Sequence, residues 1–503
     1  MIRTVLNALA FVACTSFATA HAQPVTRVES GLLSGTLQDG IASYRGIPFA
    51  APPIGPLRWR APAPPVDWNG VRDATHYGAA CIQPERGDGG GGGRADVQSE
   101  DCLTLNVWAP ENAAGLPVMV WIHGGGHRIG SGTFTIYDGS ALARQGVVLV
   151  TINYRIGLLG YFAHPALTRE AARRPLGNYG MMDQIAALEW IQRNIAAFGG
   201  DPQRVTVFGE SAGGASTLYL LANPRAQGLF QGAIVQSGGG LQRPTSLPEQ
   251  ESRGVEAVQR IGLSANATMA QLRAVPAERW NDALGPLQGL GFGPFIDGQL
   301  ITEAPSRAFA EGRALDLPLM IGANDNEASV IATLGGDGAL ALLGAGQEHL
   351  RSLYGEASDD EYRRQALGDA FFVAPAAWIA MQASGGAPSY LYHFTYVPER
   401  RRGRTPGAGH GTEIPHIFQS WDQLPIPHGF ITDEDEAFGR MMSSCWVSFA
   451  QTGVPHCANG PEWPAYTRES DQLMLFAPQT RVAQQPRREA ADFLLSVLTG
   501  PTP

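Results

Sequence analysis

The amino-acid sequence predicts an α/β protein with a mainly parallel, doubly wound central sheet and helices on both of its faces. Short apolar runs typical of buried strands alternate with segments in which apolar residues recur at helical spacing. Within this alternation, the β-rich run Val205–Phe208 passes through Gly-Glu-Ser-Ala-Gly (209–213) into a small-residue helical segment. The chain shows no internal repeat and no linker of disordered composition. We therefore expect one domain over residues 23–503.

The predicted strands are short apolar runs bounded by turn residues. They are Gly31–Leu37, Ile41–Tyr44, Leu103–Trp108, Val118–Ile122, Val147–Asn153, Val205–Phe208, Gly232–Gln236, Pro318–Gly322 and Tyr390–Tyr396. The prolines of Arg45–Pro53 exclude a regular helix and predict an extended surface segment.

One helix is predicted over Asp183–Phe198, because its isoleucines and leucine recur with a period near 3.6 residues. Helical patterns also dominate from about Leu241 to Leu315 and over Asp337–Ala387. We expect these two regions to be insertions that cover the strand ends.

The composition is that of a globular protein with an acidic balance. Of 503 residues, 44% are hydrophobic and 16% are charged, and the formal net charge is −10. That charge argues against nucleic acid as a partner. All 36 basic residues are arginines. The absence of lysine excludes lysine nucleophiles and Schiff-base chemistry.

The N-terminus has the features of an export signal. Arg3 supplies a positive start, Val5–Ala13 is mostly apolar, and Ala20-His-Ala22 forms a cleavage site of the A-x-A type. We expect a cleaved signal peptide over residues 1–22 and a secreted or periplasmic protein. Lipidation at Cys14 is the alternative, because Phe11–Cys14 loosely resembles a lipobox. The rest of the sequence contains no run of about 18 uncharged apolar residues, so it predicts no membrane span.

The cysteines fit an exported protein. Removal of the signal takes Cys14 away and leaves Cys81, Cys102, Cys445 and Cys457. An even number in an oxidising compartment predicts two disulfides, and we expect the two short-range pairs, Cys81–Cys102 and Cys445–Cys457. Neither pair has the C-x-x-C spacing of structural zinc sites. The glycine-rich stretch between Cys81 and Cys102 is interpreted as a loop tied at its base.

Gly-Glu-Ser-Ala-Gly on a strand–turn–helix matches the G-x-S-x-G pattern of nucleophilic serines. A serine on such a sharp turn needs small neighbours if its hydroxyl is to be exposed, and the following helix directs N–H groups toward an oxyanion. Ser211 is therefore the candidate nucleophile. It needs a base, a group that orients the base, and oxyanion donors.

Candidates for each of these roles lie at the ends of predicted strands or in loops. His410, in a loop of small residues, is the favoured base and His416 its rival, whereas His349 on a helical stretch and His393 on a strand are more simply structural. Asp325 and Glu327, directly after an apolar strand, both qualify as the orienting acid. His123-Gly-Gly-Gly126 matches the HGGG type of oxyanion loop.

These and other motifs make the chain similar to the type B carboxylesterases of the α/β-hydrolase fold, a group that includes cholinesterase relatives and fungal lipases. The matching segments are Tyr44–Pro48, Ser99–Asn106, Trp121–Gly126, Asn153–Arg155, Gly177–Gly180, Asp183-Gln184, Asn194–Pro202, Phe208–Gly214, Gln236–Gly238, Asp297-Gly298, Asn324–Ala328, Gly407–Glu413 and Trp463–Tyr466. They run through most of the mature chain.

The resemblance implies a role for each catalytic group. Ser211 would be the nucleophile, His410 the base, and Glu327, rather than Asp325, the orienting acid. The backbone N–H groups of Gly125, Gly126 and Ala212 would stabilise the oxyanion of an acyl-enzyme mechanism. The resemblance also supports the Cys81–Cys102 pair, implies a small-molecule ester as substrate, and requires no metal or organic cofactor.

The chain departs from the family pattern at three places. The loop between Cys81 and Cys102 has no aromatic residue, which argues against a cholinesterase. His127 stands where relatives usually have an aromatic residue; we interpret it as pocket-lining or surface rather than as a second catalytic histidine or metal ligand. Arg400, Arg401, Arg402 and Arg404 precede the His410 loop, and we favour a solvated loop over a site for substrate carboxylates.

Specificity is left open by the motifs, because triad and oxyanion donors are indifferent to the acyl chain. A lipase, an amidase, or a polyester or polycarboxylate-ester hydrolase of the same fold is an alternative to a carboxylesterase. A binding protein that uses the scaffold without catalysis is a second class, against which Ser211, Glu327 and His410 together argue. The sequence predicts no oligomeric state.

Overall fold

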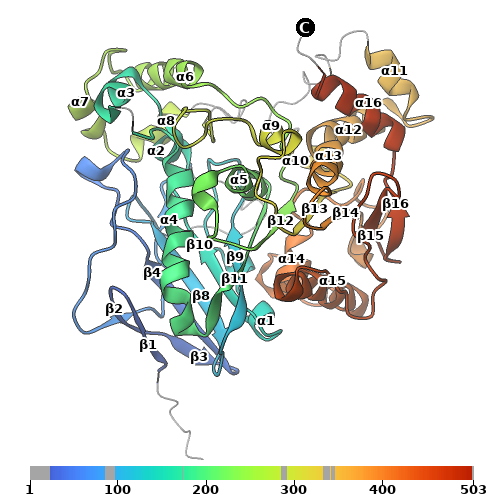
Figure 1. Ribbon diagram of the computed structural model, residues 1–503, viewed down its shortest axis with the longest axis horizontal. Helices are drawn as coiled ribbons and strands as arrows, with labels where there is room; N and C mark the ends of the chain where they lie inside the picture. Colours follow the sequence, from blue (N-terminus) through green and yellow to red (C-terminus); the bar gives the residue numbers. More distant parts are fainter. Residues whose placement is uncertain are drawn as a thin grey trace, which may run out of the picture.

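The centre of the molecule is an eleven-stranded sheet (Figure 1). The computed structural model describes residues 23–84, 97–172, 174–284, 292–331, 340 and 346–500. In spatial order the strands are β16 (Arg481–Gln484), β15 (Gln472–Phe476), β14 (Ser389–Phe394), β13 (Leu319–Asn324), β12 (Gly232–Gln236), β11 (Gly200–Glu210), β9 (Leu116–Ile122), β10 (Val148–Ile152), β8 (Thr104–Pro110), β4 (Ile41–Pro48) and β3 (Thr36–Gln38).

The pairings from β10 through β9, β11, β12, β13 and β14 to β15 are all parallel. The strands beyond them, β16 at one edge and β8, β4 and β3 at the other, pair antiparallel. Two small sheets lie outside: β1 (Val25–Val28), β2 (Gly31–Ser34) and β5 (Val71–Asp73) form one, and β6 (Ala80–Cys81) and β7 (Gln98–Ser99) the other. The mainly parallel, doubly wound sheet is thus confirmed.

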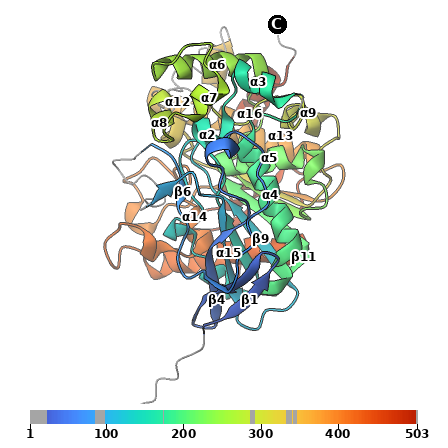
Figure 2. The same ribbon diagram turned by 90° about the vertical axis from the view of Figure 1, so that its left-hand side faces the viewer.

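Helices connect the strands and lie on both sides of the sheet (Figures 1 and 2). They are α1 (Ser140–Ala143), α2 (Gly157–Tyr161), α3 (Pro165–Ala171), α4 (Tyr179–Asn194), α5 (Ala212–Leu221), α6 (Leu247–Arg260), α7 (Met269–Arg273), α8 (Arg279–Ala283), α9 (Pro305–Ala310), α10 (Ala328–Ile331), α11 (Gly346–Ser352), α12 (Asp359–Gly368), α13 (Ala374–Ala383), α14 (Ile414–Phe418), α15 (Asp433–Thr452) and α16 (Arg488–Leu498). The π-helical turn η8 (Asp369–Val373) joins α12 to α13.

The side chains of each central strand alternate between two cores. On β9, Val118, Val120 and Ile122 pack into one core, together with residues of α4, α5 and α13. Met119 and Trp121 pack into the other, with residues of α1, α14 and α15. Alternate side chains of a strand point to opposite faces, so an almost continuous apolar run is what a strand covered on both faces requires. This explains why strands such as β9 were predictable from their apolar runs.

The predicted segments coincide with the observed ones except near the N-terminus. Helices occupy the two regions expected to be insertions, and in both views α3, α6, α7 and α8 gather at one end of the molecule. The prediction of an extended surface segment over Arg45–Pro53 is half wrong. β4 continues to Pro48, and Ile47 and Phe49 are 0% and 2% exposed, because this stretch pairs with β8 and fills the first core.

One continuous helical stretch among the described residues, Asp359–Ala383, is long and apolar enough to cross a membrane, with a mean hydropathy of 1.3. It comprises α12, η8 and α13, and 67% of its apolar window is buried inside the protein. Ala376, Ile379 and Ala380 belong to the first core. Its hydropathy is therefore that of a core helix.

Both disulfides expected from the sequence are present, Cys81–Cys102 and Cys445–Cys457. The second joins the buried face of α15 to the loop that follows that helix. Disulfides persist in oxidising compartments, which indicates an extracellular or periplasmic location. The signal peptide over residues 1–22, Cys14 within it, and most of the glycine-rich loop lie outside the described residues.

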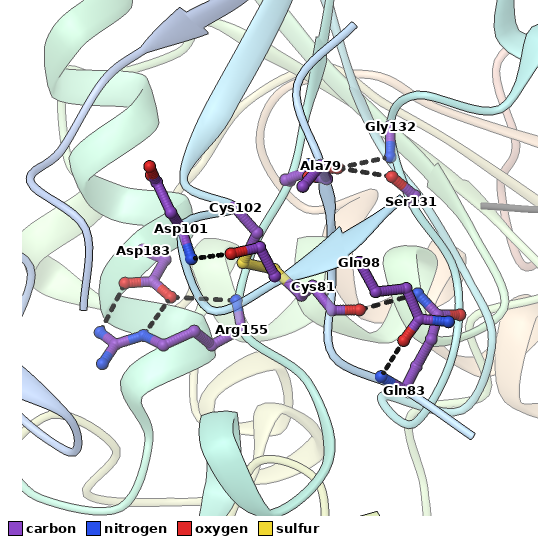
Figure 3. The surroundings of a disulfide bond; sticks show 12 residues. Ala79, Cys81, Gln83, Gln98, Asp101, Cys102, Ser131, Gly132, Arg155 and Asp183 are labelled. Atoms are coloured by element: carbon purple, nitrogen blue, oxygen red, sulfur yellow. Dashed lines mark hydrogen bonds and ion pairs between the residues drawn. A yellow bond between two sulfur atoms is a disulfide. The ribbon is translucent and has the colours of Figure 1, made fainter. Parts of the chain in front are cut away.

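A buried ion pair anchors α4 to the chain that leaves β10. Arg155 donates from Nε and Nη2 to the two carboxylate oxygens of Asp183, both at 2.7 Å, and Asp183 is fully buried (Figure 3). The same carboxylate accepts from the Arg155 backbone N–H at 3.0 Å. Such a pair contributes little over an apolar substitute, but removal of one partner leaves an uncompensated buried charge.

The Asp183→Asn substitution should therefore lower the free energy of unfolding by about 3 kcal/mol, because the Arg155 guanidinium stays buried without its counter-charge. Denaturant titration followed by circular dichroism measures this. The control is Glu256→Gln, which breaks an exposed helical pair with Arg260 and should cost less than about 0.5 kcal/mol. Equal losses in the two variants would contradict the assignment.

Candidate active site

Ser211 lies on the turn between β11 and α5 in a strained backbone conformation. Its φ is 56° and its ψ is −122°, which is uncommon for a residue with a side chain. The Ser211 N–H donates to the carbonyl oxygen of Gln236 at 2.8 Å, at the end of the neighbouring strand β12. The turn is thus held by the sheet at the carboxyl end of β11, and Ser211 lines the cavity described below.

The glycines on either side of Ser211 allow helix α5 to approach the sheet closely. A Cβ at Gly213 would lie 2.0 Å from the carbonyl oxygen of Ile122, at the end of β9. A Cβ at Gly209 would lie 2.6 Å from the Gly213 carbonyl carbon and 2.7 Å from the same Ile122 oxygen. Real Cβ atoms do not come this close, so both positions require glycine for packing.

The glycines after His123 lie directly beside this turn. A Cβ at Gly124 would be 3.1 Å from the Ser211 Cβ and 2.7 Å from a carboxylate oxygen of Glu210. Gly125 and Gly126 have φ values of 104° and 63°, which favour glycine. Within the described part of the chain, the N–H groups of Gly125 and Gly126 donate to no other group. The structure therefore brings HGGG and the G-x-S-x-G turn together.

His410 and Glu327 are in direct contact. His410 Nδ1 is hydrogen-bonded to Glu327 Oε2. The Glu327 carboxylate is fully buried and also accepts from Ser237 Oγ at 2.5 Å and from the Asn324 N–H at 2.7 Å. The His410 backbone N–H donates to Ser329 Oγ at 2.9 Å. These bonds fix the imidazole, and its other nitrogen faces Glu210.

Two further buried carboxylates surround His410, and the sequence interpretation missed both. Glu210 Oε1 lies 3.0 Å from His410 Nε2. Glu413 accepts from Gln236 Nε2 at 2.9 Å and from Asn324 Nδ2 at 2.6 Å. Glu210 is the residue before the serine in G-x-S-x-G, and Glu413 follows His410 by three positions. Their closeness in the sequence to Ser211 and His410 is the feature that could have indicated a place in the site.

The pKa values of these groups are strongly perturbed. Burial would lower the pKa of His410, but the carboxylates of Glu210 and Glu327 outweigh it and raise the pKa to about 10. Burial raises the pKa of Glu210 to about 8, while His410 opposes that rise. Burial likewise raises the pKa of Glu413. The pair Glu210–His410 therefore holds a proton at neutral pH, and the imidazolium form is favoured electrostatically.

The rival candidates lie elsewhere. Asp325 Oδ1 is 3.7 Å from His393 Nε2, and no contact of Asp325 with His410 is found among the described residues. His416 is fully buried among aromatic rings, with Trp421 4.3 Å and Phe438 4.9 Å away between ring centroids. His349 on α11 packs against Phe493. These positions favour structural roles.

Ser211 and His410 open into a cavity of about 1740 Å³. Aromatic side chains supply much of its wall, including Phe134, Tyr137, Phe371, Phe372 and Trp421. The Phe372 ring lies 5.2 Å from the His410 ring. The inserted helical regions contribute Glu278, Asn281 and Asp282 around α8. The expectation that these regions cover the strand ends is met at this cavity.

His127 lies in the wall of this cavity and is buried. Its Nε2 is 3.1 Å from Ser216 Oγ, and burial lowers its pKa to about 3, so the ring is neutral at physiological pH. The prediction of a pocket-lining residue is met.

Of the four arginines before the His410 loop, only Arg401 lies in the cavity wall. Arg402 pairs with Glu434, and Arg400 and Arg404 are exposed. Arg401 is also exposed, so all four positions fit the solvated loop, and Arg401 in addition borders the cavity.

Comparison with known proteins gives matches over nearly the whole chain. The model of the carboxylesterase family matches residues 22–354 and 346–494. Fumonisin B1 esterase of Sphingopyxis macrogoltabida is 38% identical, over 90% of this chain and 86% of its own. Para-nitrobenzyl esterase of Bacillus subtilis is 37% identical, over 92% and 97%. A solved para-nitrobenzyl esterase structure superposes with a TM-score of 0.82 at 36% identity, over 94% of this chain and 100% of that one.

The Glu210→Gln substitution should lower the pKa of His410 by about one unit or more, because one of the two carboxylates that stabilise its imidazolium is removed. NMR titration of ¹³C-labelled histidines measures this, with the His410 signal assigned from a His410→Asn variant. The exposed carboxylate Glu469 provides the control, since Glu469→Gln should leave the midpoint unchanged. An unshifted midpoint in Glu210→Gln would contradict the role of Glu210.

Proposed function

The chain belongs to the carboxylesterase family and is a carboxylic ester hydrolase, and from this premise we propose that Ser211, His410 and Glu327 catalyse ester hydrolysis through an acyl-enzyme. The observation that carries the proposal is the contact of a buried Glu327 with His410 Nδ1, beside the strained Ser211 turn and in one cavity with it. Base, orienting acid and nucleophile in this arrangement are the requirements of serine hydrolysis.

In the proposed mechanism, Ser211 Oγ attacks the ester carbonyl carbon while His410 Nε2 takes the hydroxyl proton. The tetrahedral oxyanion accepts hydrogen bonds from the N–H groups of Gly125, Gly126 and Ala212. Collapse breaks the carbon–oxygen bond of the ester, and His410 gives its proton to the departing alcohol. Water then attacks the acyl-enzyme by the same sequence, which releases the acid and restores Ser211. Glu327 stabilises the imidazolium that forms in each half.

Catalysis requires His410 to be neutral when it accepts the proton, and the buried carboxylates oppose this. Transfer of the proton from His410 Nε2 to Glu210 Oε1, 3.0 Å away, before Ser211 attacks would resolve the conflict, because it leaves a neutral ring with Glu327 as the orienting group. Burial raises the pKa of Glu210 to about 8 and so supports this transfer. Glu210 would thus carry the proton that His410 must lack.

We also propose that residues 23–503 form one catalytic domain, exported by a cleaved signal peptide over residues 1–22. A single sheet joins strands from β3 to β16, which supports one domain. The two disulfides support export.

The Ser211→Ala substitution should lower kcat by roughly a million-fold, and Glu327→Gln by about 10⁴-fold, by analogy with triad deletions in other serine hydrolases. Steady-state hydrolysis of a para-nitrophenyl ester measures both. Asp325→Asn is the matched control, since Asp325 was the rival acid and contacts His393 instead of His410. A loss in Asp325→Asn as large as that in Glu327→Gln would contradict the assignment of the acid.

Family membership does not select the ester. The two relatives above are named for different substrates, fumonisin B1 and para-nitrobenzyl esters. The aromatic wall of the cavity suits an apolar acyl or alcohol group. Arg401 adds a positive charge to that wall. An ester that carries a free carboxylate is therefore a second candidate substrate class beside a neutral one.

The Arg401→Gln substitution should lower kcat/KM for a carboxylate-bearing ester by about two- to five-fold relative to a neutral ester of the same size, the equivalent of an exposed ion pair. The effect should decline as salt rises. Arg404→Gln is the control, because Arg404 lies in the same loop but outside the cavity wall. Equal selectivity in all three proteins would exclude a carboxylate site at Arg401.

A further inference from the structure

The side-chain amide of Gln83 pairs with the backbone of Gly130. Gln83 Nε2 donates to the Gly130 carbonyl oxygen at 2.9 Å, and the Gly130 N–H donates to Gln83 Oε1 at 2.8 Å. Nε2 also lies 3.1 Å from the Cys81 carbonyl oxygen, so the amide uses both of its donors. The side chain is 7% exposed. The Gln83 amide thus binds both the N–H and the carbonyl oxygen of one residue, and these two hydrogen bonds act as a clamp that fixes the position of Gly130.

Gly130 is the far end of the loop that begins with the oxyanion glycines. A Cβ at Gly130 would lie 2.5 Å from the Gly124 carbonyl oxygen and 2.4 Å from His123 Nδ1. The loop between them closes on itself, because the Arg128 and Ile129 N–H groups both donate to the Gly125 carbonyl oxygen at 3.1 Å. Gly130 therefore packs directly behind Gly124, whose other side faces Ser211.

Gln83 is itself fixed by the disulfide-tied strands. It follows Cys81 by two residues, and its backbone N–H donates to Gln98 Oε1 at 2.9 Å. Gln98 begins β7, which pairs with β6. Figure 3 shows Gln83, Gln98, Ser131 and Gly132 on one side of the disulfide.

A second bridge runs in parallel to the first. Asn153 Nδ2 donates to the Ala79 carbonyl oxygen at 3.0 Å, while Asn153 Oδ1 accepts from Ser131 Oγ and the Gly132 N–H at 2.9 and 2.8 Å. The segment after Gly130 would thus stay attached to the sheet if Gln83 were lost. Gln83 differs from Asn153 because its partner, Gly130, packs against Gly124.

We propose that Gln83 is a positioning residue for the oxyanion loop, which transmits the fixed geometry of the disulfide-tied strands through Gly130 to the N–H groups of Gly125 and Gly126. The proposal rests on the mechanism proposed above. Oxyanion donors act through preorganisation, so a small displacement lowers transition-state stabilisation without a matching effect on substrate binding. A positioning role of this kind affects kcat and leaves KM nearly unchanged.

The test uses Gln83→Met, which keeps the length of the side chain and removes both hydrogen-bonding groups. Gln83→Asn is the second variant, because its amide is one methylene too short to reach both atoms of Gly130. The control is Gln192→Met on α4. Gln192 Nε2 likewise donates to two backbone carbonyls, those of Pro202 and Leu229, at 2.8 and 2.9 Å, away from the cavity.

Active sites are first counted by covalent labelling with a fluorophosphonate, so that kcat refers to folded enzyme only. We expect both Gln83 variants to lose about ten- to a hundred-fold in kcat with KM within about two-fold, as for a slightly misplaced catalytic group. The inhibition constant of a trifluoromethyl ketone, which forms a tetrahedral adduct with an active-site serine, should rise by the same factor. Gln192→Met should change none of these values.

Two results would overturn the proposal. One is an unchanged kcat per labelled site in both Gln83 variants. The other is a loss of kcat/KM in Gln192→Met as large as that in the Gln83 variants, which would show a general effect of lost stability. A parent enzyme that hydrolyses esters but is not labelled would overturn the proposed mechanism instead, so the two failures are distinguishable.

Discussion

The close approach of helix α5 to strand β9 determines how Ser211 lies relative to the glycines that follow His123. A Cβ at Gly213 would be 2.0 Å from the Ile122 carbonyl oxygen, so α5 can start at this distance only because Gly213 has no side chain. The approach places Ser211 against Gly124, at the point where β9 ends. Ser211 has a positive φ of 56° at the turn between the strand and this helix. The strain of the turn is offset by the packing of α5 in the first core.

Burial of charge is the second constraint, and it follows from the first. Three buried carboxylates, those of Glu210, Glu327 and Glu413, lie around one histidine, His410. Glu327 and Glu413 are stabilised by hydrogen bonds from neighbouring side chains and backbone, whereas the pKa of Glu210 rises to about 8. A low dielectric strengthens each of these interactions and makes an unpaired charge costly. The protonation state of His410 therefore depends on which carboxylate holds a proton.

The parts of this structure that local patterns encode were predictable from the sequence. The central strands are apolar on both faces, and the Ser211 turn combines a strand, two glycines and a helix. Burial of Ile47 and Phe49 was not predictable, because it depends on pairing with β8, which lies some 60 residues further along the chain. The roles of Glu210 and Glu413, and the clamp of Gln83 on Gly130, likewise arise from contacts between distant segments. Chemistry alone allowed Asp325 or Glu327; in the structure it is Glu327 that contacts His410.

In the proposed mechanism, Ser211 carries the acyl group during turnover. Acid quench within the first turnover of an activated ester, followed by peptide mapping with mass spectrometry, locates that group. We expect the acyl group on the peptide that contains Ser211, at close to one equivalent per active enzyme when deacylation is slow. An acyl group on another residue, or ester hydrolysis at full rate with no acylated peptide at any time, would contradict it.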